Sequence, residues 1–306
     1  MFRGARLLDG IRDLVPDWGV VLAAVVTQLG DGWWLLALGL GASWATAWRR
    51  RGRPGHRPGV GRSDGPWFLA VIVGGLAVMT ALKHFFALPR PDLGTVVPAW
   101  LPSSLEPLYR SVASAGGYGF PSGHAVGATV TYGLFALILE AGTRRLRLAV
   151  ATSLVAAVSA TRLVLGVHYP LDVVAGVVVG GAYLAVAWRL LERSPFDRTI
   201  TASGLALTLA GVAGLTSGGA DSAVGYVALV AGALAGWLGG QALPMPTAGR
   251  YHTGVLLLAI GALTTVGVSL FDGRARLVAS ATLLGLLAGV PTAVLSRSNR
   301  GEPASD

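Results

Sequence analysis

The chain has 306 residues, of which 53% are hydrophobic and only 13% are charged, so it lacks the polar surface of a soluble domain, which carries about 25% charged residues. Its net charge of +9 would suit nucleic acid, but the Arg residues form short clusters between apolar segments, as membrane orientation requires, and we expect no nucleic-acid partner. The absence of cysteine excludes disulfides and thiolate metal sites.

Apolar segments long enough to cross a bilayer recur along the chain and predict an all-α fold, a polytopic bundle of about nine transmembrane helices. Residues 1–17 mix charged and apolar groups at helical spacing, which indicates a helix in the membrane interface. Residues 20–48 are interrupted by the sequence GDG and predict one span entered through a short or broken helix. Further spans are expected at 66–88, 121–141, 147–166, 168–190, 199–216, 223–241, 253–270 and 277–295.

The expected spans form two parts of different composition. Residues 1–198 hold all the polar clusters described below and form the predicted membrane core. Residues 199–306 are rich in Gly and Ala, which allow helices to pack closely, and their spans bear almost no charge. We expect this second part to be a separable membrane extension of about four spans, with a role that the sequence does not reveal.

The distribution of basic residues predicts the orientation in the membrane. If the Arg-rich loop 49–65 is cytoplasmic, 15 of the 24 basic residues lie on the cytoplasmic side and nine lie on the other side. This orientation predicts a multi-pass protein of the cell membrane with an outer N-terminus. Segment 92–120 is then a long external loop, and three polar clusters reach the membrane at the non-cytoplasmic face.

The first and third clusters contain cations that suit a phosphoryl group. The first is KHFFALPRP, in which Lys83 is the only lysine of the chain and Arg90 follows seven residues later. The third, ATRLVLGVHYPLDV at residues 160–173, contains Arg162. Arginine presents a planar fork to phosphate oxygens and lysine presents a point charge, so we expect a phosphate-binding site here.

The second cluster, PSGH at residues 121–124, has the features of an anion site at a helix start. Pro121 favours the first turn, Ser122 offers a hydroxyl, and Gly123 lets the backbone approach a ligand closely. His124 would then stand beside the bound anion. In the third cluster, His168 and Asp172 are four residues apart and share a helical face.

These groups suit phosphoryl transfer without a metal or other cofactor. A carboxylate bonded to one imidazole nitrogen fixes the tautomer and makes the other nitrogen a better nucleophile. A second histidine can protonate the leaving oxygen.

Taken together, the three clusters resemble the signature motifs of the type 2 phosphatidic acid phosphatase superfamily, in particular its membrane lipid phosphatase branch. The family pattern is Lys, six residues, Arg-Pro; then Pro-Ser-Gly-His; then Ser-Arg, five residues, His, three residues, Asp, and every spacing matches here. Thr161 stands where the family usually has Ser. The resemblance covers about residues 10–195.

The resemblance implies a role for each matching residue. His168 would be the nucleophile that forms a phosphohistidine, Asp172 its orienting partner, and His124 the general acid for the leaving group. The implied phosphate-binding residues are Lys83, Arg90, Ser122, Gly123 and Arg162. The implied activity is hydrolysis of a lipid phosphate or diphosphate monoester, such as phosphatidic acid, phosphatidylglycerophosphate or a polyprenyl diphosphate.

Other interpretations remain open from the sequence. Lys83 and Arg90 could be snorkelling anchors, PSGH an ordinary helix start, and His168 with Asp172 a structural pair. The same intermediate could pass its phosphoryl group to an acceptor hydroxyl, and a non-enzymatic lipid or phosphate transporter could use the same cations. Asp31 is costly in an apolar segment and is expected to face the bundle, although the motifs assign it no role. The sequence does not indicate the oligomeric state.

Overall fold

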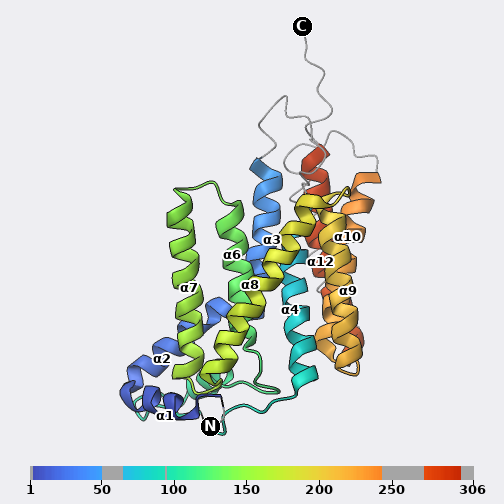
Figure 1. The fold of residues 1–306 in the computed structure, drawn as a ribbon. Coiled ribbons are helices and arrows are strands. Elements are labelled where there is room, and N and C mark those ends of the chain that lie inside the picture. Colours follow the sequence, from blue (N-terminus) through green and yellow to red (C-terminus); the bar gives the residue numbers. More distant parts are fainter. Residues whose placement is uncertain (1–2, 50–64, 94, 243–271, 298–306) are drawn as a thin grey trace. The chain divides into compact units, whose positions relative to one another are not determined.

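The computed structural model of the protein describes residues 3–49, 65–93, 95–242 and 272–297. This part of the chain is helical and contains no strand, which confirms the all-α class (Figure 1). The elements are α1 (Ala5–Leu14), α2 (Asp17–Val26), η1 (Thr27–Gly30), α3 (Gly32–Arg49), α4 (Trp67–Phe86), α5 (Glu106–Ala113), α6 (Gly123–Ile138), α7 (Arg144–Val164), α8 (Pro170–Arg193), α9 (Arg198–Thr216), α10 (Asp221–Ala242) and α12 (Gly273–Arg297).

Six helices of the described part, α4, α7, α8, α9, α10 and α12, are long and apolar enough to cross a membrane. The pair Asp17–Gly30 and Gly32–Ala47, bent by 43° at Asp31, makes a seventh candidate and matches the broken first span that the sequence predicts. Helix α6 is apolar but has only 16 residues, and the expected span 253–270 lies outside the described residues. The class of polytopic membrane protein is therefore confirmed, whereas the count of nine spans is not.

The chain divides into two compact units, each assembled from two stretches of sequence. Unit 1 comprises Met1–Leu35 and Val78–Val186, and unit 2 comprises Leu36–Ala77 and Ala187–Asp306. All residues of the three motifs belong to unit 1. The separation of a core 1–198 from an extension 199–306 stays a prediction.

In unit 1, glycines of α8 allow this helix to pack directly on α6. A Cβ atom on Gly176 would lie 2.8 Å from the carbonyl oxygen of Ser122, and one on Gly180 would lie 2.9 Å from that of Val126. The backbone N–H of Ser122 donates a hydrogen bond of 2.9 Å to the carbonyl of Asp172. The close packing thus joins the second motif to the third at one end of the bundle (Figure 1).

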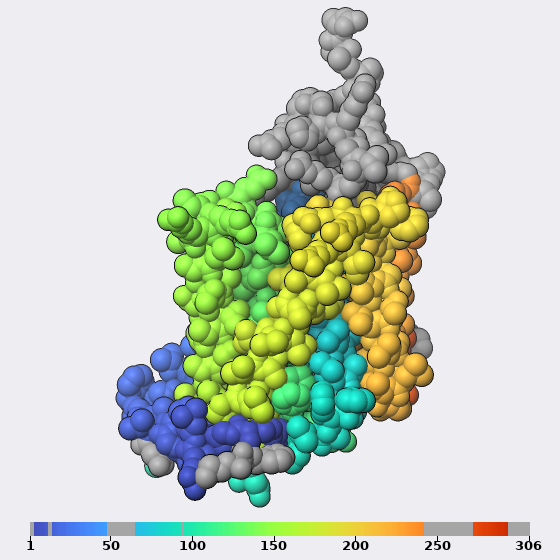
Figure 2. All heavy atoms as spheres, in the orientation of Figure 1, coloured from blue at the N-terminus to red at the C-terminus, as the bar shows by residue number. Residues whose placement is uncertain are grey.

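Helix α7 forms an outer flank of unit 1. It begins at an N-cap in which the Thr143 hydroxyl accepts a hydrogen bond from the N–H of Leu146 at 3.2 Å. Side chains such as Leu148 and Val150 are exposed along it, and Figure 2 shows α7 at the surface over its whole length. Exposed apolar side chains on a long helix are what a lipid-facing span requires.

The segment 92–120, predicted as a long loop, contains the short helix α5. Its Tyr109 and Ala113 pack against Ala23, Ala24 and Leu165, and this apolar contact stabilises a helix that is too short to be stable alone. An ion pair of 2.8 Å joins its Arg110 and Glu106 one turn apart. The prediction of a loop is therefore wrong for residues 106–113, which form a helix.

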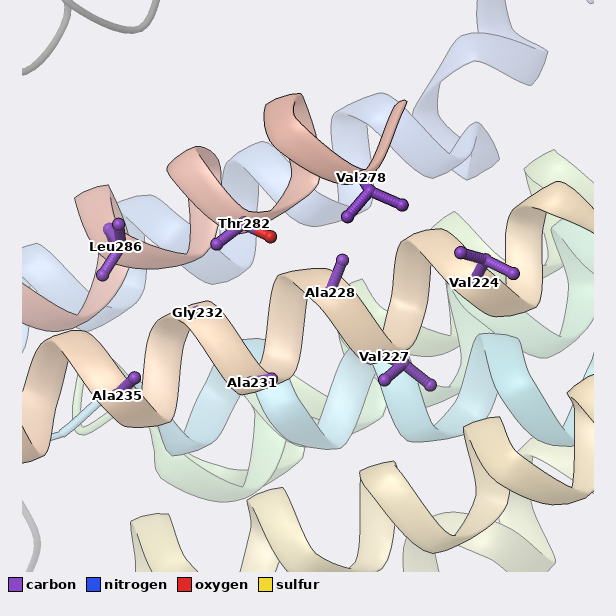
Figure 3. Close-up of a pocket in the computed structure, with 9 residues that line it drawn as sticks. All are labelled: Val224, Val227, Ala228, Ala231, Gly232, Ala235, Val278, Thr282 and Leu286. Carbon is purple, nitrogen blue, oxygen red and sulfur yellow. The ribbon is translucent and has the colours of Figure 1, made fainter. Parts of the chain in front are cut away.

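In unit 2, small residues bring α10 and α12 into backbone contact, as the Gly/Ala-rich composition predicts. A Cβ atom on Gly285 would lie 2.2 Å from the Leu229 carbonyl oxygen, and one on Gly289 would lie 2.2 Å from that of Ala233. A pocket of about 500 Å³ lies along these two helices (Figure 3). Apart from Thr282 its lining is apolar, and it contains no residue of the three motifs.

Candidate active site

The structure brings the three motifs together at one end of unit 1. Lys83 lies in the last turn of α4, His124 in the first turn of α6, and Arg162 in the last turn of α7. His168 lies between α7 and α8, within electrostatic range of Lys83, Arg90 and Arg162. All eight predicted site residues are placed in this cluster, although their roles stay predictions.

His168 is the most deeply enclosed of the three motif histidines, with 1% of its surface exposed. Its Nε2 lies 2.8 Å from Nη1 of Arg90. A guanidinium can only donate, so we assign the lone pair to Nε2 and the proton to Nδ1, which lies 3.7 Å from Oδ2 of Asp172. This is the tautomer that a nucleophilic Nε2 needs.

The surroundings of His168 also favour its neutral form. Burial, followed by the charges of Arg90, Arg162 and Lys83, lowers the pKa of His168 well below the usual value of 6.5. The imidazole is therefore unprotonated at neutral pH. A neutral ring with its free lone pair among cations can attack a bound phosphoryl group.

Two hydrogen bonds hold the carboxylate of Asp172 in place. Its Oδ1 accepts a hydrogen bond from Nη1 of Arg3 at 2.8 Å, and its Oδ2 accepts one from the backbone N–H of Tyr169 at 3.0 Å while facing His168. Arg3 also donates to the Pro89 carbonyl, and its guanidinium lies 4.5 Å from the centre of the Tyr169 ring. Sequence reasoning missed Arg3, because nothing marks one basic residue of the N-terminal segment as the partner of a carboxylate 169 positions later.

The cations are oriented by neutral oxygen atoms. Nζ of Lys83 donates to the Tyr118 carbonyl at 2.5 Å, and Nη1 of Arg162 donates to Oγ1 of Thr27 at 2.7 Å. Arg90 donates from Nε to the carbonyls of Gly116 and Gly117 at 3.0 and 3.1 Å. Since these contacts add no counter-charge, the positive charge of the cluster remains available to an anionic ligand.

Several buried side-chain donors of the cluster lack a hydrogen-bond partner among the described residues, and they include Nδ1 of His168, which faces Asp172 at 3.7 Å. Oγ of Ser122 and Nε of Arg162 also belong to this group. Buried polar groups are normally bonded, and a phosphate oxygen would satisfy the donors of Ser122 and Arg162. Gly123 begins α6 beside them, so the free N–H groups of this helix start add to the anion site.

The second histidine is more accessible and has a carboxylate nearby. The side chain of His124 is 21% exposed, and its Nε2 lies 3.9 Å from Oδ2 of Asp31 at the break between η1 and α3. Arg162, Arg90 and Lys83 also act on it electrostatically. In the sequence, Asp31 is notable because a carboxylate is costly in an apolar segment. Only the fold shows that this carboxylate lies beside His124.

Thr161, which stands where the third motif usually has Ser, leaves the phosphate-binding groups unchanged. Thr161 is buried, and its hydroxyl donates to the Val158 carbonyl at 2.6 Å within α7. A serine hydroxyl makes the same bond inside a helix, so the extra methyl group of threonine is the only difference.

Comparison with known proteins identifies the region that contains the motifs. Residues 65–196 match the model of the PAP2 superfamily. A crystal structure of a transmembrane PAP2 type phosphatidylglycerolphosphate phosphatase from Bacillus subtilis is similar at 20% identity, covering 62% of this chain and 84% of that chain with a TM-score of 0.47. No curated protein matches the chain. The protein is thus a multi-pass membrane protein in which residues 65–196 match the model of the PAP2 superfamily.

Proposed function

We propose that this protein is an integral membrane phosphatase that hydrolyses a lipid phosphate or diphosphate monoester through a phosphohistidine on His168. The family match supports a phosphatase. The observation that carries the proposal is the setting of His168, whose Nε2 lies 2.8 Å from Arg90 while Asp172 faces Nδ1. A structural histidine would not need to lie within electrostatic range of three cations.

The first half of the proposed reaction forms the phosphohistidine. The phosphoryl group binds among the cations, Ser122 and the start of α6, and the N–H of Arg90 turns from Nε2 to a phosphate oxygen. Nε2 of His168 then attacks phosphorus, and the bond from phosphorus to the lipid oxygen breaks. His124 gives its proton to that oxygen, while Asp172 stabilises the positive charge on the phosphorylated ring.

The second half releases phosphate. His124, now neutral, takes a proton from a water molecule, and the oxygen of this water attacks phosphorus. The bond between Nε2 and phosphorus breaks, so His168 returns to its neutral form and inorganic phosphate leaves. The charge that develops on the phosphoryl oxygens is stabilised by the same cations in both halves.

We further propose that the site lies at the non-cytoplasmic face of the cell membrane. The count of 15 basic residues against nine supports this orientation. The headgroup of an outer-leaflet lipid would then enter the site while its tails stay among the helices.

The function is tested by phosphate release from detergent-purified protein in the presence of EDTA. The substrates are phosphatidic acid, phosphatidylglycerophosphate and a polyprenyl diphosphate, and the expected result is metal-independent release with a clear preference among them. Vanadate, which mimics the trigonal-bipyramidal transition state, is expected to inhibit. Transfer of phosphate to an added alcohol instead of water would identify a phosphotransferase, and no turnover of any substrate would refute both enzymatic proposals.

The pH dependence of kcat/KM provides a second test. Because the pKa of His168 is lowered, its neutral form persists below pH 6.5, and activity is lost only as the pH falls through that lowered pKa. We expect a bell-shaped profile, with the alkaline limb set by deprotonation of His124. The acid limb should be the same for substrates whose own phosphate pKa values differ. A common acid limb centred above pH 6.5 would contradict the proposed state of His168.

A further inference from the structure

The segment that precedes the family-matched region contacts three residues of the site. Arg3 bonds to Asp172 at 2.8 Å, Thr27 accepts from Arg162 at 2.7 Å, and Asp31 lies 3.9 Å from His124. These three residues belong to none of the motifs and lie outside residues 65–196. The segment therefore supplies side chains to a site whose motifs all come later in the chain.

We propose that this segment provides one positioning residue for each catalytic histidine: Arg3 for His168, acting through Asp172, and Asp31 for His124. The proposal rests on the phosphohistidine mechanism given above and extends it to residues that the family motifs do not include.

The contact of Arg3 with Asp172 is a buried ion pair. The two side chains are only 5% and 0% exposed. One carboxylate oxygen is bonded to Arg3 and the other to the N–H of Tyr169, so the carboxylate is fixed with Oδ2 toward Nδ1 of His168. Without the guanidinium, a fully buried carboxylate would lose its counter-charge and its orientation.

Arg3 is also connected to the Nε2 side of the His168 ring, through Pro89 and Arg90. Its Nη2 donates to the carbonyl of Pro89, the residue before Arg90, and Arg90 contacts Nε2 of His168. Its backbone carbonyl accepts from the N–H of Leu171 at 3.4 Å. A single side chain thus connects the first motif to the third on both sides of the nucleophile.

Asp31 faces Nε2 of His124, which leaves Nδ1 for the leaving group. The distance of 3.9 Å is too long for a direct hydrogen bond, yet a carboxylate this close favours the protonated ring that a general acid needs. Burial of His124 disfavours its protonation most, and the charges of Arg162, Arg90 and Lys83, together with the neighbouring His168, act in the same direction. A carboxylate 3.9 Å away acts in the opposite direction.

A glycine permits this approach. A Cβ atom on Gly30 would lie 2.4 Å from Cγ1 of Val158 and 3.2 Å from Cδ2 of His124. Any side chain at this position would push η1 away from α6 and α7. The break in the first span thus brings Asp31 within reach of the general acid.

The test uses two substrates with the same lipid body and different leaving groups. Phosphatidic acid loses an alkoxide oxygen that must be protonated as it leaves. Diacylglycerol diphosphate loses a phosphate monoester, which has a second pKa of about 6 and leaves unprotonated at neutral pH. A residue that serves the general acid affects only the first substrate, whereas a residue that serves the nucleophile affects both equally.

The expected results differ between the two variants. Asp31→Asn should lower kcat/KM about tenfold for phosphatidic acid and less than about threefold for the diphosphate. Arg3→Gln should lower kcat/KM about 30-fold for both substrates, since it misorients the partner of the nucleophile, and Arg3→Lys should recover part of this loss by restoring the charge. Asp17→Asn and Arg6→Gln make the same chemical changes at exposed positions of the same segment and should match wild type.

The outcomes separate this inference from the proposed function. Thermal unfolding in detergent is measured for each variant, and rates are compared at a temperature where all are folded. The inference is overturned if Asp31→Asn and Arg3→Gln match their controls, or if both variants reduce the two substrates by the same factor in proportion to lost thermal stability. If wild type hydrolyses neither of these substrates nor any lipid of the panel used to test the function, the proposed function itself fails.

Discussion

Replacement of His168 with alanine is expected to abolish turnover, with kcat reduced by at least about 10⁴-fold. The reason is that, in the proposed mechanism, Nε2 is the atom that bonds to phosphorus. Its two nearest polar neighbours cannot replace it: Arg90 only donates, and Asp172 accepts hydrogen bonds from Arg3 and Tyr169 on the far side of the ring. Phosphate release with EDTA present measures the loss.

A trapping experiment examines the intermediate directly. Wild-type protein mixed briefly with lipid substrate labelled in its phosphate should acquire an acid-labile, base-stable label, and His168→Ala should acquire none. His84→Ala is the matched control. His84 lies within the first motif, but its Nδ1 bonds to the Thr80 carbonyl at 2.9 Å and its ring packs edge-on against Tyr118. Persistent labelling of His168→Ala would place the nucleophile elsewhere.

Substitution of Arg162 by lysine is expected to lower kcat/KM about 100-fold although the charge is kept. Arg162 is 2% exposed and uses Nη1 to bond Thr27, so its remaining N–H groups, including the unsatisfied Nε–H, can serve the phosphoryl oxygens as a fork. Lysine cannot bond Thr27 and two phosphate oxygens in this geometry. Arg162→Gln, which also removes the charge, should lose more.

The affinity for vanadate distinguishes lost transition-state binding from a general disturbance of the fold. If Arg162 binds the equatorial oxygens, the inhibition constant for vanadate should rise in step with the loss of kcat/KM. Arg110→Lys is a suitable control, because Arg110 is exposed on α5 and pairs only with Glu106 among the contacts described for its side chain. Unchanged vanadate affinity in Arg162→Lys would show that Arg162 does not bind the phosphoryl group.

Much of the candidate site could be predicted from sequence because its residues occur in three short motifs. Lys83 and Arg90 are close in sequence at the end of one helix, and His168 and Asp172 are one helical turn apart. The spacing of each pair in sequence therefore predicts how its two side chains lie in space. The same holds for the broken first span, where Gly and Asp interrupt an apolar run, and the structure confirms a bend of 43° there.

The supporting contacts could not be predicted in this way. The pairs formed by Arg3 with Asp172 and by Thr27 with Arg162 join residues 169 and 135 positions apart. An arginine near an apolar segment has a simpler explanation as a membrane anchor, and no local pattern distinguishes the two uses. The helix α5 was missed for a similar reason, since its stability comes from contact with α2 and the end of α7.

The sequence by itself determined that this is a polytopic helical membrane protein, and that three motifs between residues 83 and 172 have side chains that suit a phosphate. Composition, the length of apolar segments and the spacing of residues within a motif are local properties, so they can be determined from the sequence without a structure. Only the tertiary structure decided which nitrogen of His168 carries the lone pair and which oxygen of Asp172 faces this ring. It also decided that Arg3 bonds to Asp172 and that Asp31 lies near His124. Those relations depend on how close helices approach one another, and that distance is set by packing between residues far apart in the chain.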